Sequence, residues 1–209
     1  MEKVVVVGGS GFVGSHVADC LSDNGYQVII FDYINSPWLR ADQNMVIGDI
    51  LDTDKLEQTI KGAKFVYNFA ALADLNQALD KPVKTVEINI LGNLNVLEAC
   101  RIHNVKRFIY ASTVYVHSRE GSFYRCSKQS SESYVDEYQK AYNLDYTILR
   151  YGSLYGPRAD DTNGMYRIVS SALKTGKVQY KGDIESMREY IHVDDAARAS
   201  ISVLDESFK

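Results

Sequence analysis

Three regularly spaced glycines, Gly8, Gly11 and Gly14, stand between an apolar run and an amphipathic stretch in VVVVGGSGFVGSH. The apolar run predicts a buried strand, and the stretch after it predicts a helix. Glycine suits this junction because the turn is tight, and because helix, strand and a bound pyrophosphate approach the backbone closely. The motif predicts a dinucleotide site at the helix N-terminus, where Phe12 and Val13 add backbone N–H groups; the alternative is a merely tight turn.

The rest of the chain repeats this alternation of short apolar runs with longer amphipathic stretches. Runs typical of buried strands recur as YQVIIFD, MVIGD, KFVYNFAA, RFIYAST and DYTILRYG, and helix-length segments such as 83–103 and 122–142 lie between them. The pattern indicates βαβ units, so we expect an α/β protein with a Rossmann-type, doubly wound parallel sheet. Residues 1–152 would form the dinucleotide-binding domain, and residues 153–209 a short, incomplete substrate-binding region packed on the same domain.

Two further expectations concern individual elements. In the helix expected at 83–103, the apolar residues recur at helical spacing and are expected to cover one face of the sheet; they are Val86, Ile90, Leu94 and Leu97. After residue 152 the pattern loosens and predicts a helix at 165–176, a short strand at 178–183 and a last helix at 192–204.

A carboxylate ends the second predicted strand. Asp32 lies eighteen residues after Gly14, where a dinucleotide fold needs an acceptor for the ribose hydroxyls of the adenosine. Tyr33 and Ile34 follow it, without an adjacent arginine or lysine to receive a 2′-phosphate. NAD is therefore favoured over NADP as the cofactor, with a solvated turn residue as the alternative reading of Asp32.

A second carboxylate, Asp49, closes the next strand in VIGDI. Together with Ile50 it is expected to contact the adenine, although a turn or cap role is an equal alternative for a strand-terminal aspartate. Asp52 follows and is expected to cap the next helix.

Composition argues against several classes of partner. The net charge of −4 provides no basic surface for nucleic acid or an anionic membrane. The start, MEKVVVVGGSG, is apolar for too few residues to form a signal-peptide core or to span a bilayer. The cysteines, Cys20, Cys100 and Cys126, are widely spaced and odd in number, which argues against a zinc site and a disulfide framework. We expect a cytoplasmic protein without a metal.

The stretch SFYRCSK places Tyr124 four residues before Lys128, at the start of the helix expected at 122–142. Any i, i+4 pair shares one helix face, so the spacing fits two solvated neighbours as well as a catalytic pair. The preceding strand, RFIYAST, ends in Ser112 and Thr113, and doubly wound sheets bind ligands beyond the carboxyl ends of their strands. A hydroxyl, a phenol and an ammonium would then meet at the nicotinamide end of the cofactor.

This trio suits the oxidation of a secondary alcohol, which must lose a proton together with a hydride. A phenol with a pKa near ~10 is a poor base at neutral pH, but nearby positive charge lowers that pKa. Tyr124 would act as acid/base, while Lys128 lowers the pKa of Tyr124 and holds the cofactor ribose. Thr113 or Ser112 would bind the reacting oxygen; the alternative is that these hydroxyls only cap strand and helix ends.

In combination, these motifs resemble the extended short-chain dehydrogenase/reductases, and within them the NAD-dependent epimerase/dehydratase branch that acts on nucleotide sugars. The resemblance rests on the glycine array, the two carboxylates, Tyr124 with Ser127 and Lys128, and the stretches NFAAL, NILGNLNVLEA, RYGSLYGPR and REYIHVDDAARA. It implies an enzyme that transfers hydride from a sugar hydroxyl to NAD. It also implies a homodimer that pairs through the helices 83–103 and 122–142.

The resemblance assigns cofactor roles to further residues. It implies that Ala70 and Ala71 line the nicotinamide side, and that Asn89 fixes the neighbouring helix and loop. The backbone from Tyr151 to Ser153 would contribute to the nicotinamide pocket.

The resemblance also assigns substrate-binding roles. Ser153 stands where many relatives have an asparagine that contacts the substrate diphosphate, and Arg158 and Arg188 would bind the substrate, Arg188 through the diphosphate. A surface pairing with Glu189 or Asp194 is the alternative for Arg188.

The end of the strand RFIYAST departs from the family pattern. Aligned through the strand, Thr113 takes the place of the catalytic Ser or Thr, whereas alignment backwards from Val114 and Tyr115 puts Ala111 there. The strand register favours Thr113, with Ser112 as the second candidate. The sugar dehydratases have acidic residues where Val114 and Tyr115 stand, so 4,6-dehydration is disfavoured against epimerisation or simple oxidation and reduction.

The family pattern continues past HVDDAARA with elements that complete the sugar-nucleotide pocket, whereas this chain ends about one helix later. Either the chain is a shortened form, or the protein keeps the cofactor half without a full substrate lobe. The leading hypothesis is an NAD-dependent oxidoreductase or epimerase of a nucleotide sugar. The alternatives are a reductase of small carbonyl compounds, an NAD(H)-binding regulator without turnover, and a structural subunit.

Overall fold

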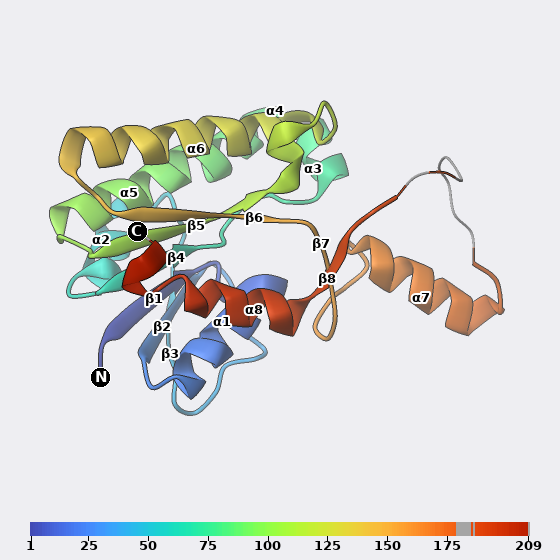
Figure 1. The fold of residues 1–209 in the computed structure, drawn as a ribbon, viewed down its shortest axis with the longest axis horizontal. Helices are drawn as coiled ribbons and strands as arrows, with labels where there is room; N and C mark the ends of the chain where they lie inside the picture. Colours follow the sequence, from blue (N-terminus) through green and yellow to red (C-terminus); the bar gives the residue numbers. More distant parts are fainter. Residues whose placement is uncertain (179–184, 186, 209) are drawn as a thin grey trace.

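A parallel sheet forms the centre of the protein in the computed structural model, which describes residues 1–178, 185 and 187–208 (Figure 1). Within these residues the sheet has six strands in the order β3-β2-β1-β4-β5-β6. They are β1 (Lys3–Val7), β2 (Gln27–Asp32), β3 (Asn44–Ile47), β4 (Phe65–Asn68), β5 (Arg107–Thr113) and β6 (Tyr146–Tyr151). The strand order reverses direction next to β1, which confirms the doubly wound, Rossmann-type sheet and places the ligand crevice at the carboxyl ends there.

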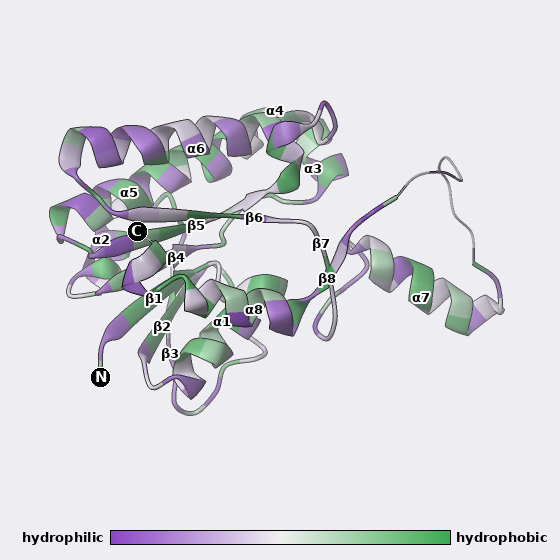
Figure 2. Cartoon of the chain, in the orientation of Figure 1, coloured by the Kyte–Doolittle hydropathy of each residue, from purple (hydrophilic) through white to green (hydrophobic). Residues whose placement is uncertain are grey.

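The central strand β1 is apolar throughout because helices cover both of its faces. Val5 and Val7 belong to a core cluster with Leu97 of α5 (Gly92–Ile102). Val4 and Val6 belong to the opposite cluster, which includes residues of α1 (Phe12–Asp23) and α8 (Val193–Ser202). Figure 2 shows this pattern as hydrophobic colour along the central strands, beside helices of mixed colour.

The remaining helices complete the two covering layers. α2 (Thr53–Ile60), α5 and α6 (Ser122–Tyr142) pack on the face opposite α1 and α8, and α3 (Leu75–Asp80) lies near the start of α6. The bounds of α6 agree with the helix predicted at 122–142. None of the described helices is long and apolar enough to cross a membrane.

The helix predicted at 83–103 is interrupted. It consists of α4 (Pro82–Val86), a π-helical turn η1 (Glu87–Leu91) and α5. The expected apolar stripe is only partly right, because Val86 is 51% exposed while Thr85 and Asn89 are buried. The wider π-helical turn shifts the helical register, so residues before it face a different direction from the one that regular spacing predicts.

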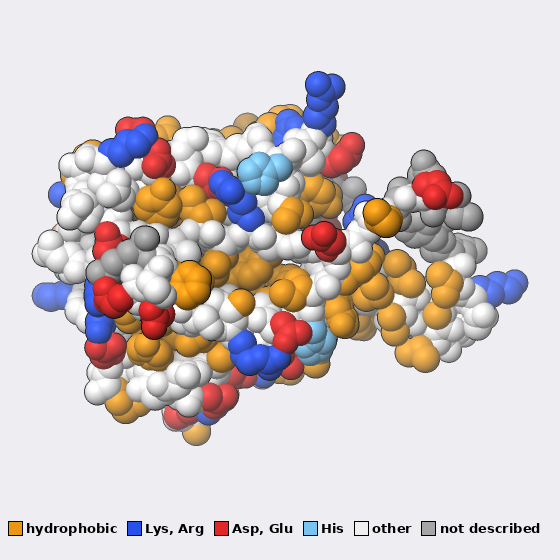
Figure 3. Space-filling model, viewed as in Figure 1, with side chains coloured by type: hydrophobic (Ala, Val, Ile, Leu, Met, Phe, Trp, Pro, Cys, Tyr) orange, Lys and Arg blue, Asp and Glu red, His pale blue; other side chains and the backbone are white. Residues whose placement is uncertain are grey.

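The chain after β6 forms a small lobe and then returns to the main sheet. β7 (Ser153–Tyr155) and β8 (Tyr190–His192) pair in parallel, and α7 (Gly164–Thr175) projects from the body in Figure 1. Hydrophobic side chains gather over α7 in Figure 3. Val169 and Leu173 of this helix are exposed. α7 and α8 match the predicted last two helices, while the strand predicted at 178–183 lies, apart from its first residue, outside the described residues. The division at residue 152 stays a prediction.

Candidate active site

The glycine loop joins β1 to α1 at the carboxyl end of the central strand. A Cβ on Gly8, which has a φ of +78°, would lie 2.4 Å from the backbone nitrogen of Ala70. A Cβ on Gly14 would lie 2.3 Å from the Gly8 carbonyl oxygen. At Gly11 the nearest atom would be 3.4 Å away, an ordinary contact. Packing therefore explains Gly8 and Gly14, whereas the bare backbone at Gly11 suits the close approach of a ligand.

The first turn of α1 presents unpaired backbone donors beside this loop. Gly11 is the N-cap residue, and no side chain from the described residues caps the turn. The N–H groups of Phe12, Val13 and Gly14 have no acceptor within the helix, and the helix dipole favours an anion at this end. The residues predicted to hold a pyrophosphate thus lie together and fit one.

Asp32 ends β2 beside the same loop. Its Oδ2 accepts a hydrogen bond from the Ser10 N–H at 2.9 Å, and the residue is 8% exposed. Ser10 in turn donates its hydroxyl to the Ile34 carbonyl at 3.2 Å. The carboxylate is therefore held at the edge of the loop, where a ribose acceptor is required.

The residues predicted at the adenine have different surroundings. Asp49 is exposed, and its Oδ1 accepts from the Leu51 N–H at 2.9 Å. Ile50 is buried in the core, so its side chain serves packing. Asp52 accepts from the Lys55 N–H at 3.1 Å, which confirms its predicted role as the cap of α2.

Asn89 connects the loop after β4 to α6. Its Oδ1 accepts from the Leu72 N–H at 2.7 Å, and its Nδ2 donates to the Ser127 hydroxyl at 2.9 Å. The Ser131 hydroxyl donates to the Asn89 carbonyl at 2.8 Å. The π-helical turn places this side chain between loop and helix, a common position for such turns near functional sites.

A buried asparagine that the sequence analysis missed supports the same loop. Asn68, the last residue of β4, accepts from the Ala70 N–H at 3.1 Å and donates to Asn93 Oδ1 at 2.8 Å. It thereby shapes the segment of Ala70 and Ala71, both partly buried beside Gly8. A polar residue at the end of the apolar run FVYN was the available signal.

Tyr124 is partly buried and Lys128 is buried, so the two are not simply solvated neighbours on a helix surface. Lys128 is 3% exposed, and its Nζ donates to the Ala111 carbonyl at 2.6 Å. The same Nζ lies 4.6 Å from the ring centroid of Tyr110 and 5.8 Å from that of Tyr124. The structure thus brings the ammonium and the phenol ring together at the end of β5.

Burial disfavours the charged forms of both Tyr124 and Lys128. It raises the pKa of Tyr124 well above its usual value, with a smaller effect of Tyr115, and it lowers the pKa of Lys128 to about 7 against the effect of Glu132. Without a further positive charge Tyr124 is therefore a neutral phenol. A cationic group bound beside it would favour the phenolate that general-base chemistry needs.

The two hydroxyls that end β5 differ in their partners. The Ser112 hydroxyl donates to Glu132 Oε1 at 2.5 Å, and Glu132 is held by Arg150 through bonds of 3.0 and 2.8 Å. Thr113 points to the opposite side of the strand, and its Oγ1 accepts from the Tyr115 N–H at 3.3 Å. Within the described part of the chain, the Thr113 hydroxyl proton has no acceptor, which leaves it available to a ligand.

The described geometry agrees with one family of known proteins. A model of the NAD dependent epimerase/dehydratase family matches residues 4–209. The chain belongs to this family. A putative UDP-glucose 4-epimerase of Methanocaldococcus jannaschii is 30% identical, over 97% of this chain and 73% of the relative.

Solved structures of nucleotide-sugar epimerases match this chain over nearly its whole length. A UDP-glucose 4-epimerase of Thermotoga maritima, solved with UDP-glucose, matches with a TM-score of 0.90 and 31% identity, over 97% of this chain and 73% of that chain. A UDP-glucuronic acid 4-epimerase of Bacillus cereus, solved with UDP-glucuronic acid and NAD, matches with a TM-score of 0.88 and 27% identity, over the same shares. The predicted family and fold are thus confirmed.

In this member of the epimerase/dehydratase family, Tyr151 and Ser153 connect the sheet to the small lobe. The Tyr151 hydroxyl lies 2.7 Å from the Ser200 Oγ, so its phenol is fastened to α8. The Ser153 N–H donates to the Glu189 carbonyl at 3.3 Å. Their predicted contact with the cofactor runs through the backbone and stays a prediction.

Arg158, predicted to bind the substrate, is paired with α1, and its substrate role stays a prediction. Its Nη2 is 2.6 Å from Asp19 Oδ2 on α1, and its guanidinium lies 5.0 Å from the Trp38 ring centroid. A partly buried carboxylate on α1 therefore holds the guanidinium of Arg158. Arg188 is exposed, and among the described residues it forms no ion pair, neither with Glu189 nor with Asp194.

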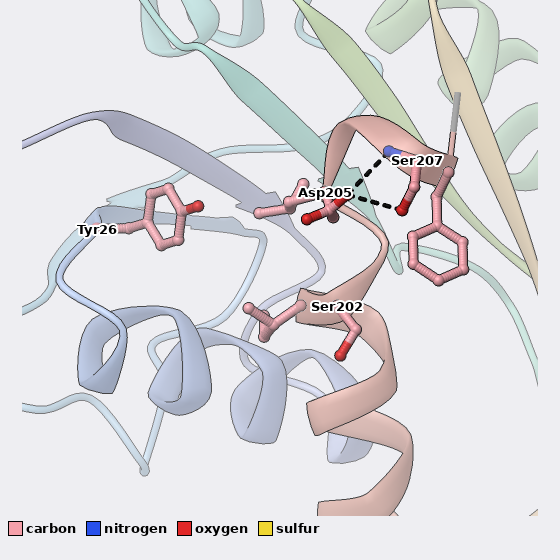
Figure 4. Close-up of a pocket in the computed structure, with 7 residues that line it drawn as sticks. Tyr26, Ser202, Asp205 and Ser207 are labelled. Atoms are coloured by element: carbon pink, nitrogen blue, oxygen red, sulfur yellow. Dashed lines mark hydrogen bonds between the residues drawn. The ribbon is translucent and has the colours of Figure 1, made fainter.

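A depression outside this site has a volume of about 560 Å³ (Figure 4). It lies between Tyr26, which precedes β2, and the end of α8 with the segment that follows it. Its carboxylate, Asp205, already accepts from the Ser207 N–H and hydroxyl at 2.9 and 2.7 Å. It adjoins the amino ends of the strands, opposite the crevice. Among the described residues, no group of His, Cys, Asp and Glu could hold a metal ion.

Proposed function

We propose that this protein is an NAD-dependent epimerase of a nucleotide sugar, in which Tyr124 and Lys128 carry out the acid–base chemistry. Family membership supports the reaction class. One observation carries the assignment of residues: the ammonium of Lys128 is buried against the Ala111 carbonyl and the rings of Tyr110 and Tyr124. A buried cation next to a phenol serves base catalysis better than it serves stability.

The cofactor is NAD, which when bound accepts a hydride from the carbon that carries the sugar hydroxyl. The first turn of α1 would hold its pyrophosphate, and Asp32 would accept its adenosine ribose hydroxyls. Lys128 would leave the Ala111 carbonyl for the ribose on the nicotinamide side, and its charge would favour the Tyr124 phenolate.

Tyr124 would then remove the proton from the sugar hydroxyl while Thr113 donates a hydrogen bond to the same oxygen. In an epimerase the keto sugar turns, receives the hydride on its other face and takes the proton back from Tyr124. Ser112 is the weaker candidate for the hydroxyl role, because its proton already goes to Glu132.

We also propose a cytoplasmic homodimer. Exposed apolar residues lie on α4 and η1, among them Val83, Val86 and Leu91, and on α6, where Phe123 and Tyr134 are exposed. Such a surface suits pairing between copies. The three cysteines are unpaired, which fits a reducing compartment.

The test is conversion of UDP-glucose, UDP-galactose, UDP-glucuronate or UDP-N-acetylglucosamine in the presence of NAD, followed by proton NMR. Tyr124→Phe is expected to lower turnover by about 10²- to 10⁴-fold. Tyr142→Phe, a 55% exposed tyrosine at the end of the same helix, is the matched control and should keep parental turnover. Full turnover by Tyr124→Phe would refute the mechanism, and NAD binding without turnover of any sugar would favour the regulator.

A further inference from the structure

Glu132 joins three elements that surround the predicted catalytic residues. It lies four residues after Lys128 on α6, so the two side chains share a helix face. Its Oε1 accepts from the Ser112 hydroxyl on β5 at 2.5 Å and from Arg150 Nε on β6 at 3.0 Å. Its Oε2 accepts from Arg150 Nη2 at 2.8 Å. One carboxylate thus fastens α6 to the carboxyl ends of two strands.

This carboxylate remains ionised although it is largely covered. Its side chain is 13% exposed, against 43% for Arg150. Burial would raise the pKa of Glu132, but hydrogen bonds from Arg150 and Ser112 outweigh burial and hold the pKa below its usual value. Lys128 therefore faces a permanent negative charge at neutral pH.

We propose that Glu132 is a positioning residue of this site, whose negative charge favours the protonated form of Lys128 and whose hydrogen bonds hold the end of β5 that carries Thr113. The proposal rests on the proposed function, in which Lys128 binds the cofactor ribose and acts on Tyr124. Nothing in the acid–base scheme itself uses Glu132, Arg150 or the Ser112 hydroxyl.

The surroundings of Lys128 explain why an anion is needed. The ammonium is almost fully buried, and within the described residues it contacts one carbonyl and lies near two aromatic rings. Burial favours loss of its proton, and the charge of Glu132 opposes that loss. The other titratable or charged groups around this pair come from α6, β5, η2 (Val114–His117) and β6; they are Tyr124, Tyr110, Tyr115, His117 and Arg150.

Removing Glu132 and removing Arg150 should shift the pH at which Lys128 loses its proton in opposite directions. Glu132→Gln keeps an acceptor for Ser112 but removes the negative charge, so Lys128 loses its proton at a lower pH. Arg150→Gln removes the positive charge and leaves Glu132 to act on Lys128, so Lys128 keeps its proton to a higher pH. A role limited to packing would weaken the same network in both variants and shift neither pH dependence.

The experiment measures the affinity for NADH from about pH 6 to pH 10 by the fluorescence of the bound nucleotide, in the parent and in both variants. We expect binding to weaken as Lys128 loses its proton. The midpoint should fall by about one pH unit in Glu132→Gln and rise in Arg150→Gln. Glu132→Asp, which restores the charge, should return the midpoint toward the parental value. Glu137→Gln, which removes a 67% exposed carboxylate from the same helix, should leave it unchanged.

Each outcome decides between the proposals. If the pH midpoints of NADH affinity coincide in the parent and both variants, or shift in the same direction in both variants, the proposed role of Glu132 is overturned. The proposed function stays intact in that case if the protein shows Tyr124-dependent epimerisation. Opposite shifts in a protein that converts no nucleotide sugar would support Glu132 as a residue of the NADH site and refute the epimerase. A parent that binds no NADH at any pH would refute both. Thermal unfolding of each variant shows which of them fold. If Glu132→Gln does not fold, Arg150→Gln and Glu132→Asp still test the direction in which the midpoint shifts.

Discussion

Arg158 and Asp19 form an ion pair across 139 positions of the chain, with Nη2 and Oδ2 2.6 Å apart. Both side chains are 20% exposed, and the guanidinium also lies over the ring of Trp38. The pair fastens the loop after β7 to the middle of α1. Beside it, His16 of α1 contacts the Pro157 carbonyl at 3.1 Å and Asp194 of α8 at 3.1 Å. These contacts indicate that the loop after β7 and the start of α8 dock on α1 as a unit.

Replacing Arg158 should therefore affect stability more than substrate binding. Arg158→Ala leaves the largely covered Asp19 carboxylate without its partner, so we expect the free energy of unfolding to fall by about 1–3 kcal/mol. Urea denaturation measures this change. Arg198→Ala, which breaks an ion pair whose side chains are 67% and 56% exposed, should change the free energy by less than about 1 kcal/mol. An unchanged stability together with a large rise in the Michaelis constant for a nucleotide sugar would instead support the predicted substrate role of Arg158.

The glycine loop offers a matched pair of substitutions. Gly14→Ala places a methyl group 2.3 Å from the Gly8 carbonyl oxygen, so the loop must move and the protein should lose stability. Gly11→Ala meets its nearest atom at 3.4 Å, so the fold should persist. Its methyl group should nevertheless obstruct the pyrophosphate, and we expect NADH affinity to fall by about tenfold or more with an unchanged melting temperature. Parental NADH affinity in folded Gly11→Ala would contradict the predicted pyrophosphate site.

The fold was largely predictable because a parallel sheet covered on both faces needs continuous apolar strands. VVVV in β1 and FIY in β5 are such runs, and they are buried as expected. The bounds of α6 agree with the helix-length segment expected at 122–142. The π-helical turn at Glu87–Leu91 was not predictable, since regular periodicity assumes an unbroken helical register, and Val86 consequently faces solvent.

The site was predictable where one motif determines it and not where distant residues meet. The glycine loop and the i, i+4 pair are local patterns, and the structure brings each of them together at the carboxyl edge of the sheet. The choice between Ser112 and Thr113 depends on Glu132, twenty residues further on, whose carboxylate accepts the Ser112 proton. The partner of Arg158 depends on a tertiary contact with α1. Such pairings leave no periodic signal in a single sequence.

The buried charge of Lys128 should be visible in the stability of the protein without cofactor. Burial lowers its pKa from 10.5 to about 7 in the folded state, so between these values the unfolded chain binds more protons than the folded one. The free energy of unfolding should therefore rise with pH across this interval, by up to about 1.4 kcal/mol per pH unit. The penalty is complete below pH 7 and is relieved as the pH approaches 10.5.

Lys128→Met removes this dependence while it keeps the length and apolar character of the side chain. Loss of the hydrogen bond to the Ala111 carbonyl lowers stability by an amount that does not vary with pH, so the slope is the decisive quantity. We expect the stability of Lys128→Met relative to the parent to be highest near about pH 6 and to decline steadily toward about pH 10, in urea denaturation without NAD. Lys140→Met, which removes a 56% exposed ammonium paired with Asp136 and Glu137, lacks the burial penalty and should show no such decline. A constant difference between Lys128→Met and the parent over this range would mean that the ammonium is not desolvated, and Glu132 would then have no effect of burial to oppose.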